Sequence, residues 1–97
     1  MTRSVRVRPE AERDVETAFA WYEEQRAGLG HELLHELDVV YERIAKFPFL
    51  YAEIYRGLRR VRLRRFPVGV IYLVTSAEIR IIAIVHSARS PKAWQSR

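Results

Sequence analysis

The sequence contains no cysteine, and this absence excludes disulfide bonds, thiolate metal ligands and cysteine nucleophiles together. It also lacks a long apolar run, because the longest fully apolar stretch, Ile81 to Val85, is far shorter than the roughly 20 residues that cross a membrane. The first residues show no apolar signal segment. We therefore expect a cytoplasmic protein that does not contact the membrane.

Glycine is also scarce, with four residues scattered along the chain. No phosphate-binding glycine loop, dinucleotide fingerprint or G-x-S-x-G motif is present, so no cofactor is predicted. A chain of 97 residues is too short for two cores. We therefore expect a single domain over residues 1–97, in which residues 88–97 form a C-terminal tail with little apolar periodicity.

Negative charge is nearly absent from the second half of the chain. Residues 1–46 carry a net charge of −3, whereas residues 47–97 carry +8, and fifteen of the seventeen basic residues are arginine. The guanidinium group holds a carboxylate or phosphate through two parallel hydrogen bonds. The sequence therefore predicts a basic surface that binds an acidic or polyanionic macromolecule.

The periodicity of the apolar residues predicts a strand, two helices and three further strands. Ser4 to Arg8 alternates as a strand does, Pro9 suits the first position of a helix, and Gly28 is the expected C-terminal stop of that helix. A second helical pattern ends at Lys46, before Pro48. The remaining strands are expected at residues 58–65, 68–75 and 78–86.

Two of these strands, 68–75 and 78–86, are apolar on both faces and should be central in the sheet. The strand at 58–65 carries several arginines and should lie nearer an edge. The expected fold is α+β, with a helical hairpin packed on one face of a mainly antiparallel four-stranded sheet.

An arginine run places six guanidinium groups between residues 56 and 65. Strand alternation should bring Arg60, Arg62 and Arg64 to one face, where they repel one another unless they are paired. A solvated strand face that blocks pairing with other strands would explain this pattern. A docking surface for phosphates or an acidic protein segment explains it too, and we favour that interpretation.

The segment His31-Glu32-Leu33-Leu34-His35 matches the H-E-x-x-H motif of zinc metalloproteases. At 100° per residue, both histidines lie opposite the apolar face of the second helix. A zinc ion there would have no third sheltered ligand. We therefore expect a solvated helix face and no metal site.

His86 ends the last strand, and Arg89 follows three residues later. An imidazole that transfers protons, with arginines that stabilise charge on phosphorus, could cleave RNA, and the candidate residues are Arg62, Arg64, His86 and Arg89. A structural histidine is the interpretation that we favour.

The chain resembles the ParE/RelE superfamily of toxins from type II toxin–antitoxin systems nearly from end to end. The resemblance is carried by Pro9-Glu10-Ala11-Glu12-Arg13-Asp14, Trp21-Tyr22, Phe47-Pro48, Leu58-Arg59-Arg60, Phe66-Pro67 with Tyr72, and Ile84-Val85-His86-Ser87-Ala88-Arg89. It implies a protein that inhibits bacterial growth and is neutralised by an antitoxin with an acidic, partly disordered segment, in a hetero-oligomer. The antitoxin-binding residues expected on this basis are Arg59, Arg60, Arg62, Arg64, Arg89 and Trp94.

The two branches of the superfamily differ in target. ParE-like members inhibit DNA gyrase, whereas RelE-like members cut messenger RNA on the ribosome, and the latter commonly carry a tyrosine after the last strand. Here His86 is followed by Ser87-Ala88-Arg89, and the tail has no tyrosine. The resemblance therefore implies the ParE-like branch and gyrase as target, with a ribosome-dependent nuclease as the alternative and a non-toxic binding module as a further one.

Overall fold

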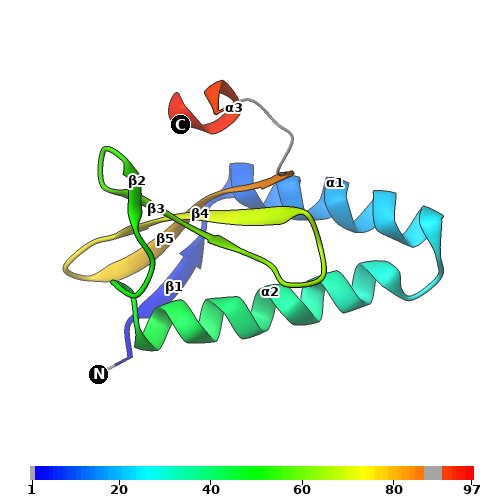
Figure 1. Cartoon of the computed structure of the whole chain (residues 1–97), viewed down its shortest axis with the longest axis horizontal. Helices are drawn as coiled ribbons and strands as arrows, with labels where there is room; N and C mark the ends of the chain where they lie inside the picture. Colours follow the sequence, from blue (N-terminus) through cyan, green and yellow to red (C-terminus); the bar gives the residue numbers. More distant parts are fainter. Residues whose placement is uncertain (1, 87–90) are drawn as a thin grey trace.

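The computed structural model describes residues 2–86 and 91–97, and it contains three helices and five strands in these ranges (Figure 1). The helices are α1 (Pro9–Gln25), α2 (Leu29–Lys46) and α3 (Lys92–Gln95). The strands are β1 (Ser4–Val7), β2 (Glu53–Tyr55), β3 (Leu58–Arg62), β4 (Val68–Val74) and β5 (Glu78–His86). None of the helices in these ranges has the length and apolar character that a membrane span requires.

The five strands form one sheet in the order β1-β5-β4-β3-β2. β1 pairs in parallel with β5, and the other neighbours are antiparallel. The predicted α+β class, the helical hairpin and the central position of the two apolar strands are confirmed. The predicted number of strands was too low by one, because β2 is a three-residue edge strand with an irregular register and no alternating pattern.

The two long helices have the predicted outer limits, since α1 begins at Pro9 and α2 ends at Lys46. Gly28 has a different place from the one predicted. α1 already ends at Gln25, and Gly28 adopts a left-handed conformation (φ 90°) as the N-cap of α2. The Glu23 carboxylate accepts hydrogen bonds from the backbone N–H groups of Gly28 (3.2 Å) and Gly30 (2.7 Å), so it fixes the turn between the helices. These hydrogen bonds lower the pKa of the Glu23 carboxyl group, and the bond from Gly28 has the largest effect.

The main core lies between the two long helices and the sheet. It joins the apolar face of α2, including Leu33, Leu37 and Ile44, to side chains from the central strands such as Tyr72 and Ile81. The Tyr72 ring is fully buried, and its hydroxyl donates to the Pro48 carbonyl at 2.8 Å. The helical hairpin is thereby tied to β4 at the end of α2.

The opposite face of the sheet, called the outer face below, carries a second and smaller core. It is formed by Ile71, Ile82 and Val85, which Trp94 covers from α3. Figure 1 shows α3 above the sheet and α2 below it. The apolar character of β4 and β5 on both faces is explained by these two cores.

Candidate functional site

The arginines of β3 are divided between the two faces of the sheet. Arg59 lies opposite Tyr72 and therefore faces the helices, whereas Arg60 and Arg62 lie opposite Ile71 and Gly69 and face outward. β3 ends at Arg62, so Arg64 lies beyond the strand and does not extend its outer face. The predicted alignment of Arg60, Arg62 and Arg64 thus holds for the first two.

Arg59 is half-buried and bonded within the molecule. Its guanidinium donates to the Tyr51 carbonyl at 2.6 Å and lies 5.1 Å from the centre of the Phe49 ring. A side chain with these contacts positions the segment after α2 and has little freedom to turn toward the outer face.

Arg60 and Arg62 are the basic residues that β3 presents on the outer face. The stem of Arg60 lies across Gly69, where an added Cβ would come within 3.3 Å of Arg60 Cδ. Across the part of the chain that the structure describes, neither guanidinium forms an ion pair with a carboxylate. Both charges are therefore without an ion-pair partner in residues 2–86 and 91–97.

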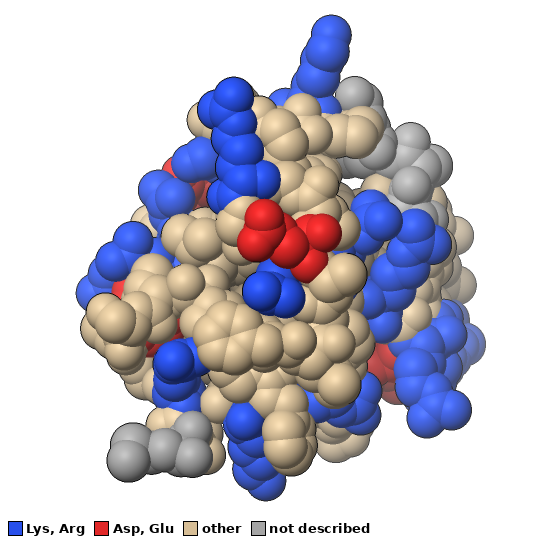
Figure 2. Space-filling model, turned by 60° about the vertical axis from the view of Figure 1, so that its left-hand side comes forward, with Lys and Arg blue, Asp and Glu red and all other residues tan. Residues whose placement is uncertain are grey.

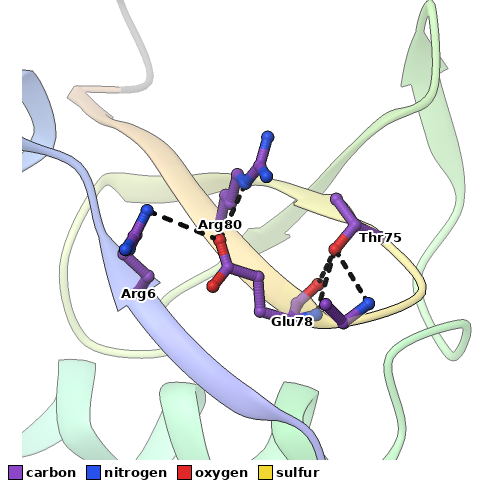
Figure 3. Close-up of polar contacts among 5 residues, drawn as sticks. Arg6, Thr75, Glu78 and Arg80 are labelled. Atoms are coloured by element: carbon purple, nitrogen blue, oxygen red, sulfur yellow. Dashed lines mark hydrogen bonds and ion pairs between the residues drawn. The ribbon is translucent and has the colours of Figure 1, made fainter.

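The other side of the outer face, on β1 and β5, is partly neutralised (Figure 3). The Glu78 carboxylate accepts a hydrogen bond from Arg80 at 2.8 Å and lies 3.9 Å from Arg6. The bond from Arg80 is the main reason why the pKa of Glu78 is lowered. Thr75 holds the preceding turn, because its hydroxyl bonds the backbone of Glu78. Among the described strands of this face, β3 is therefore the one whose arginines have no carboxylate partner.

The loop after β3 is fixed by α2. The Glu36 carboxylate accepts the backbone N–H groups of Arg64 (2.7 Å) and Arg65 (3.0 Å), while the Arg65 side chain pairs with Glu32. These bonds hold the backbone of Arg64 and Arg65 against α2, beyond the end of β3 at Arg62, which falls short of the predicted limit of residue 65. Glu32 also pairs with Arg26 at 2.8 Å, and that bond is the first cause of its lowered pKa.

His31 and His35 are exposed, as predicted from helical geometry. The ring of His31 packs edge-on against Phe19, with 5.0 Å between the ring centres. Within residues 2–86 and 91–97, no group of three or more His, Cys, Asp or Glu side chains is placed to hold a metal ion.

The proposed nuclease residues do not converge where the structure describes them. His86 pairs with Val68 on the helix-facing side of the sheet and lines a cleft of about 600 Å³ between α1 and β5. Arg62 starts from the opposite face, and Arg64 lies in the loop beyond β3. Arg89 lies outside the described residues.

A contact that sequence reasoning missed closes one wall of this cleft. Arg97 donates to both carboxylate oxygens of Asp14, at 2.6 and 3.1 Å, and to the Ile82 carbonyl at 3.2 Å. Asp14 also accepts the Ile84 N–H at 3.0 Å. The bond to Asp14 is the first cause of the raised pKa of Arg97. The two residues are 83 positions apart, so no local pattern could have indicated the pair.

Trp94 is placed in the second core, where 4% of its surface is exposed. Its ring meets that of Tyr55 edge-on, with the centres 6.1 Å apart. Because its surface is used within the chain, an antitoxin could contact Trp94 only after α3 had moved.

Comparison with known proteins agrees with this architecture. Residues 5–91 match the family described as ParE toxin of type II toxin-antitoxin system, parDE. The chain is 32% identical to the proteins named Toxin ParE2 from two strains of Mycobacterium tuberculosis, CDC 1551 / Oshkosh and H37Rv, over 99% of this chain and 92% of each relative.

A solved structure titled "Chromosomal ParDE TA system from P. aeruginosa" has the same fold, with a TM-score of 0.77. The match covers 88% of this chain and 96% of that chain at 17% identity. The extent of the family match and the identity to the mycobacterial toxins lead to one conclusion: this chain belongs to the ParE toxin family of type II toxin–antitoxin systems.

Proposed function

We propose that this toxin arrests bacterial growth by acting on DNA gyrase, and that a cognate antitoxin neutralises it by laying an acidic segment across the outer face of the sheet. The proposed antitoxin contact rests on Arg60 and Arg62. Their guanidinium groups face outward and have no carboxylate partner in the described part of the chain. Family membership supports the toxin role.

An acidic segment fits this surface for two physical reasons. Carboxylates can bind guanidinium groups through paired, charge-assisted hydrogen bonds, which relieves the repulsion between neighbouring arginines. A segment that is disordered alone can also follow an extended strand face when it folds on binding. The β1 side of the face, where Glu78 already pairs with Arg80, offers such a segment less unpaired charge.

Gyrase is favoured over messenger RNA because the described candidates for RNA cleavage, Arg62, Arg64 and His86, are dispersed. General acid–base cleavage requires an imidazole within hydrogen-bond reach of the substrate oxygen, and a cation close to the phosphorus. His86 faces the cleft on the helix side, whereas Arg62 faces outward. The alternative of a ribosome-dependent nuclease retains one supporting observation, which is that His86 shares its cleft with Arg13 and Arg97.

We expect induction of this toxin to stop DNA replication before translation, and the purified toxin to increase gyrase-cleaved DNA in a reaction with gyrase and supercoiled plasmid. The measurement is the amount of linear DNA released after protein digestion, compared with a reaction without toxin. Cleavage of ribosome-bound message with replication unaffected would favour the nuclease instead. Normal growth at high soluble expression would contradict toxicity itself.

We expect replacement of both Arg60 and Arg62 by alanine to weaken binding of the antitoxin encoded beside this toxin by about a hundredfold or more, since each of the two charge-assisted bonds contributes about 1.5 to 3 kcal/mol. The control is the double replacement of His31 and His35, which are exposed but lie on α2. Titration calorimetry of both variants measures the effect. An equal loss in the two variants would show that β3 is not the docking face.

A further inference from the structure

The turn that follows α2 exposes three large apolar side chains next to one another. Phe47, Phe49 and Leu50 have 59%, 61% and 63% of their surfaces exposed, and we call these three residues the apolar knob. Single exposed apolar residues are common, but several adjacent ones mark interaction sites far more often. The knob lies outside the outer face described above.

The backbone of this turn is held rigidly. Buried Tyr72 donates to the Pro48 carbonyl at 2.8 Å, and Arg59 donates to the Tyr51 carbonyl at 2.6 Å. The backbone that carries the knob is therefore ordered before any partner arrives. A partner then has less conformational entropy to remove on binding than it would from a free loop.

Positive charge surrounds the knob. The guanidinium groups of Arg3 and Arg59 lie 5.3 and 5.1 Å from the centre of the Phe49 ring, and Arg43 bonds the Tyr51 hydroxyl at 3.3 Å. Between residues 43 and 77 the only carboxylate is Glu53. Figure 2, which brings this end of the molecule forward, shows uncharged surface bordered mainly by basic side chains, with an acidic group near the centre of the view.

We propose that the apolar knob is a second protein-docking site, which binds a segment whose bulky apolar side chains are flanked by carboxylates. Apolar contacts would cover the rings, while the carboxylates would meet Arg3 and the basic end of α2. A second copy of this chain is a poorer occupant, because it would bring the same cations together. The site goes beyond the proposed antitoxin contact, since it uses the turn after α2 and not Arg60 or Arg62.

The experiment is a selection from a random peptide display library, with the whole protein as bait. Peptides that bind are then tested by fluorescence anisotropy against the wild type and the variants Phe49→Ser and Arg3→Glu. We expect enrichment of peptides that combine leucine or aromatic residues with aspartate or glutamate. Phe49→Ser should weaken their binding by about tenfold or more, as expected for a central interface residue. Arg3→Glu should weaken the acidic peptides and spare neutral ones.

The control variant is the double replacement of Arg60 and Arg62 by alanine, which alters the outer face and leaves the knob intact. If it weakens the selected peptides as much as Phe49→Ser does, the peptides bind elsewhere and the proposal is wrong. Enrichment of basic peptides, or of peptides insensitive to Phe49→Ser, would also overturn it. Self-association of the wild type that Phe49→Ser abolishes in sedimentation would identify a second copy as occupant instead. None of these results depends on gyrase inhibition, so they separate this proposal from the proposed function.

Discussion

Replacement of Trp94 by alanine is expected to lower the free energy of unfolding by about 3 kcal/mol, at the lower end for a buried tryptophan because α3 is a short terminal element that can separate locally. The ring is 4% exposed and covers Ile71, Ile82 and Val85. Its loss would open the second core to water. Chemical denaturation, followed by circular dichroism, measures the change.

Trp21 supplies the matched control for this experiment. Its ring also meets a tyrosine edge-on, with 4.9 Å to the centre of Tyr22, but 56% of its surface is exposed. We expect Trp21→Ala to cost less than about 1 kcal/mol, since little buried surface is lost. Similar losses in the two variants would show that α3 does not cover the outer face in solution.

Replacement of Gly30 by alanine is expected to cost about 2 to 3 kcal/mol, because the site is already filled. A Cβ added at Gly30 would lie 2.7 Å from atoms of both Glu23 and Phe19, and 2.8 Å from the Phe19 carbonyl oxygen. The carbonyl belongs to the backbone of α1, so it cannot rotate away and the two helices must separate. Denaturant unfolding measures the loss of stability.

Gly69 offers the matched control, since an added Cβ there would come no closer than 3.3 Å, to the flexible side chain of Arg60. We expect Gly69→Ala to change stability by less than about 1 kcal/mol, because Arg60 can shift and alanine suits a strand better than glycine does. If Gly30→Ala lowered the stability as little as Gly69→Ala, α1 and α2 would not approach each other this closely at the turn in solution.

Much of the fold could be predicted because single residues decide its main boundaries. Pro9 and Pro48 limit the helical region, and the apolar runs at residues 68–74 and 81–85 place β4 and β5 in the centre. β2 could not be predicted, since three residues are too few to show a period. The role of Gly28 was misjudged because a glycine between two helices can end the first or begin the second, and only its contacts decide.

The candidate site was less predictable, because it depends on contacts between distant segments. Alternation along β3 correctly placed Arg60 and Arg62 on one face, but it could not reveal that Arg64 lies beyond the strand, where Glu36 binds its backbone N–H. The charge count could not show that Arg59 is used internally. The tail shows little apolar periodicity in the sequence, and the packing of α3 explains the role of Trp94 in it.

The edge of β5 beyond its pairing with β1 affects how this protein can associate with other molecules. β1 accompanies β5 only as far as Ile81, and beyond that point the Ile82 carbonyl and the Ile84 N–H are bonded by Arg97 and Asp14. Open backbone groups along a sheet margin act as a template for strands of other chains. Here the ion pair of Arg97 and Asp14 already bonds these backbone groups. Aggregation by strand addition would first have to break this bidentate ion pair, which is largely shielded from salt.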